Sequence, residues 1–357
     1  MVVTLLEEYL RMLCTLNHFP IPAQPLVFFG LRGAIPVNDE NHDFGSARSL
    51  SMAEVDSLHP RCTIGQWRPA ERTLAVFPGS TVPHLNHIRS AQAAGGQGAN
   101  QLMTGFYTDY RKGIHKAGSS TAHEAFRQTG EHPIRRTSDD LDYDLEDPVD
   151  VENPYDNLHA AWCAGVGATD FSSAGCQVVV GYPKCDKLGN RPDSGPWAQF
   201  KKNAYDLDVD RFNYLLLEAR DLAKLADPDT TSLSVRLRFG SQGNLVKNVQ
   251  RVLREKGFYE GALDAEFGKR TFRAVCAFQR YSFGRNGADG VVGPVTASAL
   301  GIEWPMVQIA AGRSIQRNAT APTPRSIRRA MGGRAHATRR RAQSKKLKNN
   351  RKMHRPS

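Results

Sequence analysis

Residues 244–300 read NLVKNVQRVLREKGFYEGALDAEFGKRTFRAVCAFQRYSFGRNGADGVVGPVTASAL, and this stretch decides the fold of the C-terminal part of the chain. Its first segment predicts an amphipathic helix that Gly257 ends, because apolar residues recur every three or four positions: Leu245, Val246, Val249 and Leu253. A second helix opens at Thr271 and a short third helix covers 295–300, with Asp/Gly turns between them. Three short helices joined by such turns can enclose one small core of Leu, Val and Phe.

The same stretch, extended back to Leu237, resembles a peptidoglycan-binding domain, a three-helix module that anchors enzymes to the bacterial cell wall. The resemblance rests on these residues: Leu237 to Gly243, Val249-Gln250, Gly257-Phe258-Tyr259, Asp264, Phe267-Gly268, Thr271, Ala274-Val275, Phe278-Gln279, Asp289 to Pro294 and Thr296 to Leu300. It implies a module over 235–304 with peptidoglycan as its ligand. Most matched residues have a role in the core or in turns, so the resemblance implies a ligand class and no ligand contacts.

The positive charge of the chain is concentrated in its last segment. Residues 313–357 contain fifteen Lys or Arg and no Asp or Glu, whereas residues 1–312 contain 32 basic and 36 acidic residues. Because this segment lacks hydrophobic periodicity, we expect 305–357 to be a disordered basic tail. It could attract anionic envelope polymers or nucleic acid, or serve solubility alone. Nucleic acid is the less favoured partner, because no aromatic residue lies between the basic runs.

Upstream of the module, 206–234 is expected to be a helical linker. One helical stripe lies between Arg211 and Leu225, and Asp227-Pro228-Asp229 ends it. The residues of the stripe are Phe212, Leu215, Leu216, Ala219 and Leu222.

The segment 26–205 predicts a mainly β domain, because short apolar runs alternate with long polar loops. The strand candidates are Leu26 to Gly30, Thr73 to Phe77, Gly105 to Tyr110 and Val178 to Val180. Residues 1–25 precede this domain as a helical lead, because their apolar positions fit a short amphipathic helix. The expected fold class is therefore α+β: a β-rich N-terminal domain, a small three-helix module and a disordered basic tail.

Length and composition exclude several classes of protein. A chain of 357 residues corresponds to about two domains of about 150 residues each, and 40% hydrophobic residues exclude a wholly disordered chain. No stretch approaches the roughly 18 apolar residues of a membrane-spanning helix, so no membrane span is expected. Glu7 and Glu8 stand where a signal peptide carries Lys or Arg, so no Sec signal is expected and the export route stays open.

A cysteine on a tight turn is the best candidate nucleophile. The segment 173–176 forms the turn and leads into the strand expected at Val178, so backbone N–H groups beside Cys176 could form an oxyanion hole. A thiol becomes a strong nucleophile when a nearby imidazole takes its proton. His159 lies 17 positions upstream on an expected neighbouring strand, and a strand–loop–strand return brings the two side chains together.

This pattern resembles the catalytic domain of L,D-transpeptidases, whose signature is a His followed, after a strand and a loop, by Ser/Thr-His-Gly-Cys. The resemblance implies these roles: Cys176 as acyl-enzyme nucleophile, His159 as its base, Gly175 and the amide of Cys176 as oxyanion site, and Ser173 as support of the turn. Ala174 stands where the family has its second His, and Gln177-Val178 replaces an apolar-then-Asn/Arg pair. Activation is then left to His159, and no cofactor or metal is implied.

Other interpretations of these residues stay open. Cys176 could be a small buried apolar residue. A metal could bind a soft cluster formed by His159, Cys163, Cys176 and Cys185, although their spacing is irregular, and Cys163 with Cys185 could form a disulfide in an exported protein.

Two further features lie outside this motif. His115, after the strand expected at Gly105, could supply a second imidazole to the same cleft or be an ordinary surface residue. Eight carboxylates between Asp139 and Glu152 include Asp139, Asp140, Asp142 and Asp144, which could bind Ca²⁺. A solvated acidic loop is the favoured interpretation, because no Gly occupies the required turn position.

The sequence thus predicts a bacterial or phage protein that acts in the cell wall or periplasm. Its module would hold it on peptidoglycan, and its cysteine would transfer acyl groups of the stem peptide as a transpeptidase or carboxypeptidase does. The alternatives are a non-catalytic peptidoglycan-binding protein and a phage-type endolysin that uses other residues.

Overall fold

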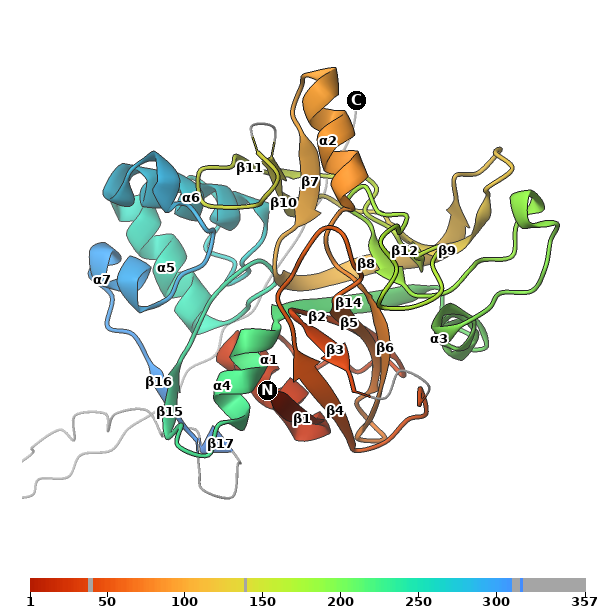
Figure 1. The fold of residues 1–357 in the computed structure, drawn as a ribbon. Helices are drawn as coiled ribbons and strands as arrows, with labels where there is room; N and C mark the ends of the chain where they lie inside the picture. The colour runs from red at the N-terminus through yellow and green to blue at the C-terminus, as the bar shows by residue number, and fades with distance from the viewer. Residues whose placement is uncertain (38–40, 138–139, 310–314, 317–357) are drawn as a thin grey trace, which may run out of the picture. The chain divides into compact units, whose positions relative to one another are not determined.

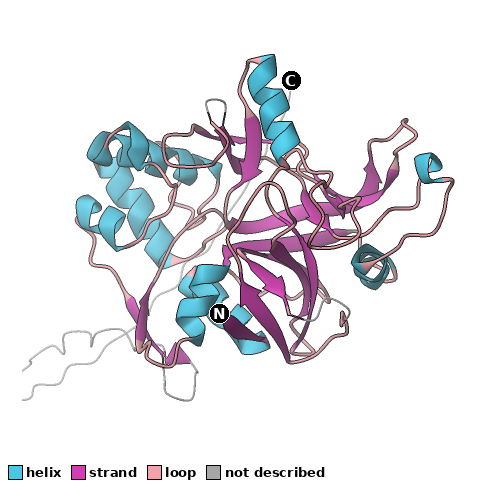
Figure 2. Cartoon of the chain, viewed as in Figure 1, coloured by secondary structure: helices cyan, strands magenta, loops and turns pink. Residues whose placement is uncertain are grey.

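The computed structural model describes residues 1–37, 41–137, 140–309 and 315–316 (Figures 1 and 2). Of the predicted basic tail, residues 310–314 and 317–357 lie outside the described part. The expectation of disorder is wrong for the start of that segment, because β16 (Met306–Ile309) pairs with both β15 (Ser232–Ser234) and β17 (Ile315–Gln316). Ile309 is buried in the same apolar cluster as the first helix, which explains why this short run is ordered.

A closed eight-stranded sheet is the centre of the β-rich part. Its strand order is β12-β13-β6-β5-β2-β14-β8-β9. The bounds are β2 Val27–Arg32, β5 Cys62–Arg68, β6 Thr73–Ser80, β8 Gly105–His115, β9 His123–Gln128, β12 Leu158–Ala160, β13 Gln177–Val179 and β14 Arg211–Glu218. All six residues of β2 are buried, and Phe28 contacts the rings of Phe126, Phe200 and Phe212 at centroid distances of 4.7 to 5.1 Å. The strands predicted at Leu26, Thr73, Gly105 and Val178 are confirmed.

The helix predicted over Arg211 to Leu225 is wrong in its first half. Residues Arg211–Glu218 form β14, which lies between β2 and β8 in the closed sheet, and only α4 (Ala219–Ala226) is helical. The apolar run of β14 is buried on both faces, since Leu216 packs in one core cluster and Leu217 in the other. A short run that is apolar on both faces has no period that separates strand from helix. The closed sheet therefore includes residues of the expected linker.

The helical lead predicted over 1–25 begins as a strand. β1 (Val2–Leu6) pairs with β4 (Ala47–Met52), which also pairs with β3 (Ala34–Pro36). The amphipathic helix itself is confirmed as α1 (Glu7–Leu16). The β-branched start of the chain favours the strand, because Val and Thr lose less freedom there than in a helix.

A third sheet and two further helices complete this part. The order β11-β10-β7 joins Val149–Glu152, His132–Thr137 and Ala99–Leu102. The remaining elements are α2 (Leu85–Ala94), α3 (Pro196–Tyr205) and the short 3₁₀ helix Asp186–Leu188.

The three-helix module predicted from the sequence is present. Its helices are α5 (Asn244–Glu255), α6 (Lys269–Phe283) and α7 (Pro294–Leu300), with a 3₁₀ turn at Arg285–Gly287. They enclose one core cluster that includes Val249, Leu253, Phe272 and Val275. Gly257 has φ +82°, a left-handed conformation that favours glycine just beyond a helix end.

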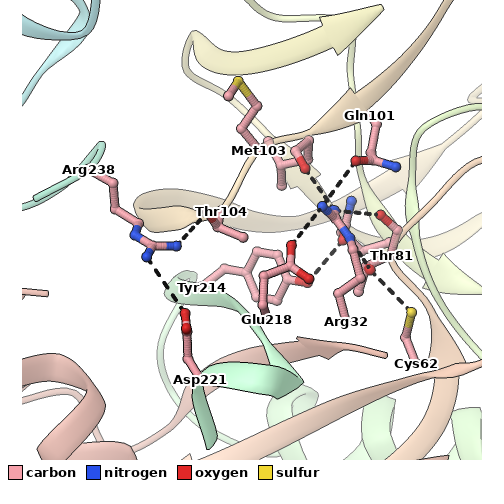
Figure 3. A network of polar contacts seen from close by, with 12 residues as sticks. Arg32, Cys62, Thr81, Gln101, Met103, Thr104, Tyr214, Glu218, Asp221 and Arg238 are labelled. Atoms are coloured by element: carbon pink, nitrogen blue, oxygen red, sulfur yellow. Dashed lines mark hydrogen bonds and ion pairs between the residues drawn. The ribbon is translucent and has the colours of Figure 1, made fainter. Parts of the chain in front are cut away.

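The module packs directly against the β-rich part. The Phe106 N–H donates to the Phe239 carbonyl at 2.9 Å, and Arg238 Nη1 donates to Thr104 Oγ1 at 2.7 Å (Figure 3). Arg135 of β10 donates to the Ala288 carbonyl at 3.1 Å. These bonds cross between the two parts at several points, so the module is held in place by more than its chain connection.

Candidate active site

The closed sheet brings the predicted nucleophile and base together. β12 and β13 are parallel neighbours with His159 opposite Val178, and Cys176 immediately precedes β13. β9 pairs with both β12 and β8 (Figure 1), and the register sets His115, the last residue of β8, opposite His123 at the start of β9. The sequence prediction that His159 lies on a strand adjoining the Cys176 turn is confirmed.

Three side chains meet at this point. One ring nitrogen each of His115 and His159 and the Sγ of Cys176 all lie within 4.8 Å of one another. The two imidazole rings stack with centroids 4.2 Å apart and planes 17° apart. The second imidazole considered at His115 is therefore placed beside the predicted pair, and we call these three residues the Cys–His–His cluster.

The turn before Cys176 is fixed by Ser173 and Gly175. The Ser173 hydroxyl donates to the Cys176 carbonyl at 2.8 Å and accepts from the Gly175 N–H at 3.3 Å. Gly175 has φ +133°, and a Cβ there would lie 2.1 Å from Asn100 Nδ2 and 2.5 Å from Asp156 Oδ1. The Gly175 N–H is thus engaged by the turn, so the Cys176 N–H is the amide of this predicted oxyanion pair that remains for a substrate.

Hydrogen bonds fix opposite tautomers on the two imidazoles. His159 Nδ1 lies 2.7 Å from the Ala160 carbonyl, an acceptor, so Nδ1 carries the hydrogen and Nε2 has the free lone pair. Asn157 accepts from the Gln128 N–H with Oδ1 at 3.0 Å, so its Nδ2 donates to His115 Nδ1 at 2.8 Å. His115 therefore carries its hydrogen on Nε2. The cluster contains one imidazole that accepts a proton and one that donates a hydrogen bond.

Burial keeps all three groups neutral. It holds the pKa of His159 well below its usual range, with His115 and His123 adding to the effect. Burial and the neighbouring His123 lower the pKa of His115 to about 4. Burial, and next the Asp156 carboxylate, raise the pKa of the Cys176 thiol to about 12. The resting pair at neutral pH is thiol and imidazole, because a desolvated site disfavours the ion pair.

Sequence reasoning missed the polar residues that hold the cluster. Asp156 is buried, accepts from Asn100 Nδ2 at 2.7 and 2.6 Å, and has a pKa that burial raises to about 7. Its N–H donates to Gln128 Oε1 at 2.7 Å. Asn157 stands two positions before His159, which was the only local signal, whereas Asn100 and Gln128 come from distant strands.

Backbone strain gathers at the rim of the cluster. Seven described non-glycine residues have positive φ, and three of them border this site: Lys116 at +51°, Tyr155 at +63° and Trp162 at +62°. Lys116 follows His115, the Tyr155 carbonyl accepts from Cys176 Sγ at 3.7 Å, and the Trp162 ring contacts His123. Such conformations are costly and are found preferentially at functional sites.

An open cavity of about 300 Å³ reaches the cluster at His115, whereas Cys176 and His159 do not line it. It is lined by Ile114, His115, Lys116, Ala117, Arg127, Tyr155 and Asn157. Its two basic residues, Lys116 and Arg127, are exposed and make no ion pair within the described residues. A substrate that carries a carboxylate therefore fits this access route.

The same three residues also have donor atoms for a metal ion. Three protein ligands and a water can hold Zn²⁺, but His115 Nδ1 accepts from Asn157 and its Nε2 carries hydrogen. This bonding leaves His115 without a free lone pair, so it suits hydrogen-bond donation through Nε2 better than metal binding. Cys163 and Cys185, considered for a metal or a disulfide, are free and lie outside this cluster.

The acidic loop after residue 139 caps its own turns. Asp139 lies outside the described residues, Asp140 Oδ1 accepts from the Asp142 N–H, and Asp144 Oδ1 accepts from the Glu146 N–H. These carboxylates bond to the loop backbone.

A second polar cavity, of about 530 Å³, lies between the module and the β-rich part. Arg32 and Arg238 line it, and Figure 3 shows both contacting neighbouring polar groups. Arg32 donates to Thr81 and to the Leu102 carbonyl, and Arg238 faces Asp221 at 3.7 Å. Because these charges are matched within the protein, the cavity is a polar interface between the two parts.

The module contains two copies of one buried polar arrangement. Gln250 Nε2 donates to Asp264, to the Glu266 carbonyl and to Thr271 at 2.6 to 3.0 Å. The corresponding contacts of Gln279 are Asp289, the Val291 carbonyl and Thr296 at 2.6 to 3.1 Å. Each Gln Oε1 also accepts a loop N–H, from Ala265 or Gly290. We call these arrangements the Gln250 node and the Gln279 node; each ties a helix to the loop and helix that follow.

Comparison with known proteins identifies one family. Residues 242–300 match the family described as "Putative peptidoglycan binding domain". No curated protein and no solved structure matches the chain. The match supports peptidoglycan binding and association with the cell wall or envelope. Within the described residues, no helix is long and apolar enough to cross a membrane.

Proposed function

We propose that this peptidoglycan-binding protein transfers acyl groups of the peptidoglycan stem peptide through Cys176. The Cys–His–His cluster carries the proposal, because it brings a thiol and one nitrogen of each of two imidazole rings within 4.8 Å of one another. The strained rim and the basic cavity support it. The match of residues 242–300 to a peptidoglycan-binding family supplies the polymer on which such chemistry would act.

The reaction starts from the neutral pair. The Cys176 thiol, which donates to the Tyr155 carbonyl at rest, turns to His159, and Nε2 takes its proton as sulfur attacks a peptide carbonyl carbon. The carbonyl oxygen becomes an oxyanion, which the Cys176 N–H and His115 Nε2–H stabilise. The intermediate collapses by breaking the C–N bond, and the leaving amine takes the proton from His159.

The thioester is resolved by the reverse sequence. An incoming amine or water gives a proton to His159 and attacks the thioester carbonyl, and Cys176 leaves and recovers the proton. An amine acceptor yields a cross-link, as in a transpeptidase, and water yields a carboxylate, as in a carboxypeptidase. Both outcomes use the same residues, so the resemblance to L,D-transpeptidases is carried by the Cys176 step.

His115 accounts for the main departure from the family pattern. Ala174 removes the imidazole that the resemblance places two positions before the cysteine. His115 arrives from β8, far away in the sequence, and stacks on His159. The cluster therefore contains two imidazoles although its motif contains one.

A non-catalytic binder is the second candidate function. The observation that favours it is the burial of Cys176, whose thiol is 8% exposed and has a pKa that burial raises to about 12. A buried thiol of this kind can be an inert core residue. The site of action would be the cell wall or periplasm in either case, and the basic segment 313–357 would attract anionic envelope polymers.

Mass spectrometry of muropeptides distinguishes the two candidates. Purified muropeptides are incubated with the full chain, with Cys176→Ala and with Cys185→Ala, a control that removes a buried thiol outside the cluster. The proposal expects new products with the wild type and with Cys185→Ala and none with Cys176→Ala. Unchanged muropeptides with all three proteins, together with retained binding to sacculi, would support the binder.

A further inference from the structure

One face of α6 exposes an aromatic residue and two arginines at helical spacing. Arg270, Arg273, Ala277 and Tyr281 follow one another every three or four positions, so they lie on one side of the helix. The Tyr281 side chain is 79% exposed, and Phe283 beyond it is 40% exposed.

This face forms an open groove with the loop after α5. The groove measures about 520 Å³ and is lined by Phe258, Tyr259, Glu260, Gly261, Arg270, Arg273, Ala274 and Ala277. Ala274 and Ala277 leave its floor shallow, so the backbone of α6 is accessible between the larger side chains. We call it the α6 groove.

The two ends of the α6 groove differ in chemistry. At one end the lining residue Phe258 is held edge-on by Phe278 at 5.4 Å, and the ring of Tyr281, beside the groove, lies 5.5 Å from Phe258. At the other end Arg273 donates to the Val151 carbonyl at 3.0 Å and stays half exposed. Arg270 is exposed and makes no ion pair with a carboxylate among the described residues.

We propose that the α6 groove binds one disaccharide-peptide unit of peptidoglycan. A sugar ring would stack on the anchored Phe258–Tyr281 pair, because aromatic rings present an apolar face beside a polar edge. A stem-peptide carboxylate would pair with the guanidinium of Arg270, which offers parallel N–H donors in the matching geometry. The inference rests on the peptidoglycan binding of the module and is independent of Cys176.

The groove fits this polymer better than a protein partner. It combines an aromatic end and a cationic end over one helix face, as a polymer that carries both sugar rings and carboxylates requires.

Co-sedimentation with purified sacculi tests the inference. The full chain is compared with Tyr281→Ala and Arg270→Ala, and the matched controls are Phe283→Ala and Arg280→Ala, which remove an exposed aromatic residue and a positive charge elsewhere on α6. Circular dichroism melting of each variant checks that the module folds. We expect each groove variant to bind about tenfold more weakly and each control to bind as the wild type does.

The outcomes separate this inference from the proposed function. Equal binding by the wild type, the two groove variants and the two controls would overturn the α6 groove while leaving peptidoglycan binding intact. A wild type that fails to sediment would overturn peptidoglycan binding and the groove with it. Weakening by Arg280→Ala as strong as by Arg270→Ala would show non-specific charge attraction and would also overturn the assignment.

Discussion

The helical module and the Cys–His–His cluster differ in how their buried polar groups are bonded. In the module, each buried Gln bonds to groups close to it in the sequence, and Arg238 Nε is the one buried side-chain atom without a partner within the described residues 235–304. The cluster draws residues from three separate segments, and His123 Nε2 beside it is buried without a partner. The module thus bonds its buried glutamines locally, whereas the cluster depends on side chains that come from distant segments.

Among the substitutions that test this comparison, we expect the largest loss of kcat at His159. His159→Gln removes the lone pair that accepts the thiol proton, so kcat should fall by about 10³- to 10⁴-fold. His123→Gln, a neighbour that the mechanism does not use, is the control and should stay within a few-fold of the wild type. Both are measured by muropeptide turnover. Equal activity of His159→Gln and the wild type would remove the base from the mechanism.

A smaller loss is expected at His115. His115→Phe keeps a stacked ring but deletes the Nε2–H, so kcat should fall by about 10²-fold with KM little changed, as for the loss of one oxyanion donor. The companion variant Asn157→Ala frees His115 Nδ1 and should lower kcat less. A loss confined to KM would place His115 in substrate binding instead of in oxyanion stabilisation.

The module offers the matching stability test. Gln279→Ala deletes three donated hydrogen bonds, leaves the Gly290 N–H without its partner and leaves Asp289 Oδ1 with the Val291 N–H, so the free energy of unfolding should fall by about 2–3 kcal/mol. Gln250→Ala should cost a similar amount, because its node has the same bonds. Exposed Gln199→Ala on α3 is the control, and denaturant unfolding is the measurement. A change below that of Gln199→Ala would mean that the nodes do not stabilise the module.

The pH profile of turnover should differ from that of an unperturbed imidazole and thiol on both its acid and its alkaline side. Burial lowers the pKa of His115 to about 4 and holds the pKa of His159 well below its usual range, so the acid limb of turnover should lie below pH 6.5. The pKa of Asp156, raised to about 7, means that its carboxylate forms only near neutrality. Its charge then opposes the Cys176 thiolate, so turnover should level off or fall above about pH 7. Asp156→Asn should abolish that alkaline effect, and an unchanged profile would remove Asp156 from it.

The sequence predicts the module well because its contacts are local. The helical stripes, Gly257 and the Asp/Gly turns lie within a few residues of the groups they organise, so spacing alone indicates their arrangement. The sequence predicts a helix over β14, because burial on both faces removes the alternation of apolar and polar residues that indicates a strand. The sequence predicts no strand at β1 for a related reason, because the short apolar run of β1 continues directly into the amphipathic helix α1.

The candidate site was predictable only along its own segment. Cys176, Ser173, Gly175 and His159 lie within 18 residues, and the parallel pairing of β12 and β13 follows from that loop. His115 reaches the cluster through the pairing of β8, β9 and β12, which no local pattern specifies. The tautomer of His115 depends on Asn157, which the Gln128 N–H of β9 orients, whereas the neighbouring Ala160 carbonyl sets the tautomer of His159.

Intact-protein mass spectrometry during turnover tests most directly whether Cys176 forms an acyl-enzyme. The full chain is mixed with muropeptides, quenched in acid within the first turnovers and digested to locate any adduct. We expect an acyl group bound to Cys176 as a thioester. It should be absent from Cys176→Ala and should accumulate when the amine acceptor is withheld. Turnover without an adduct on Cys176, or an adduct on another residue, would contradict it.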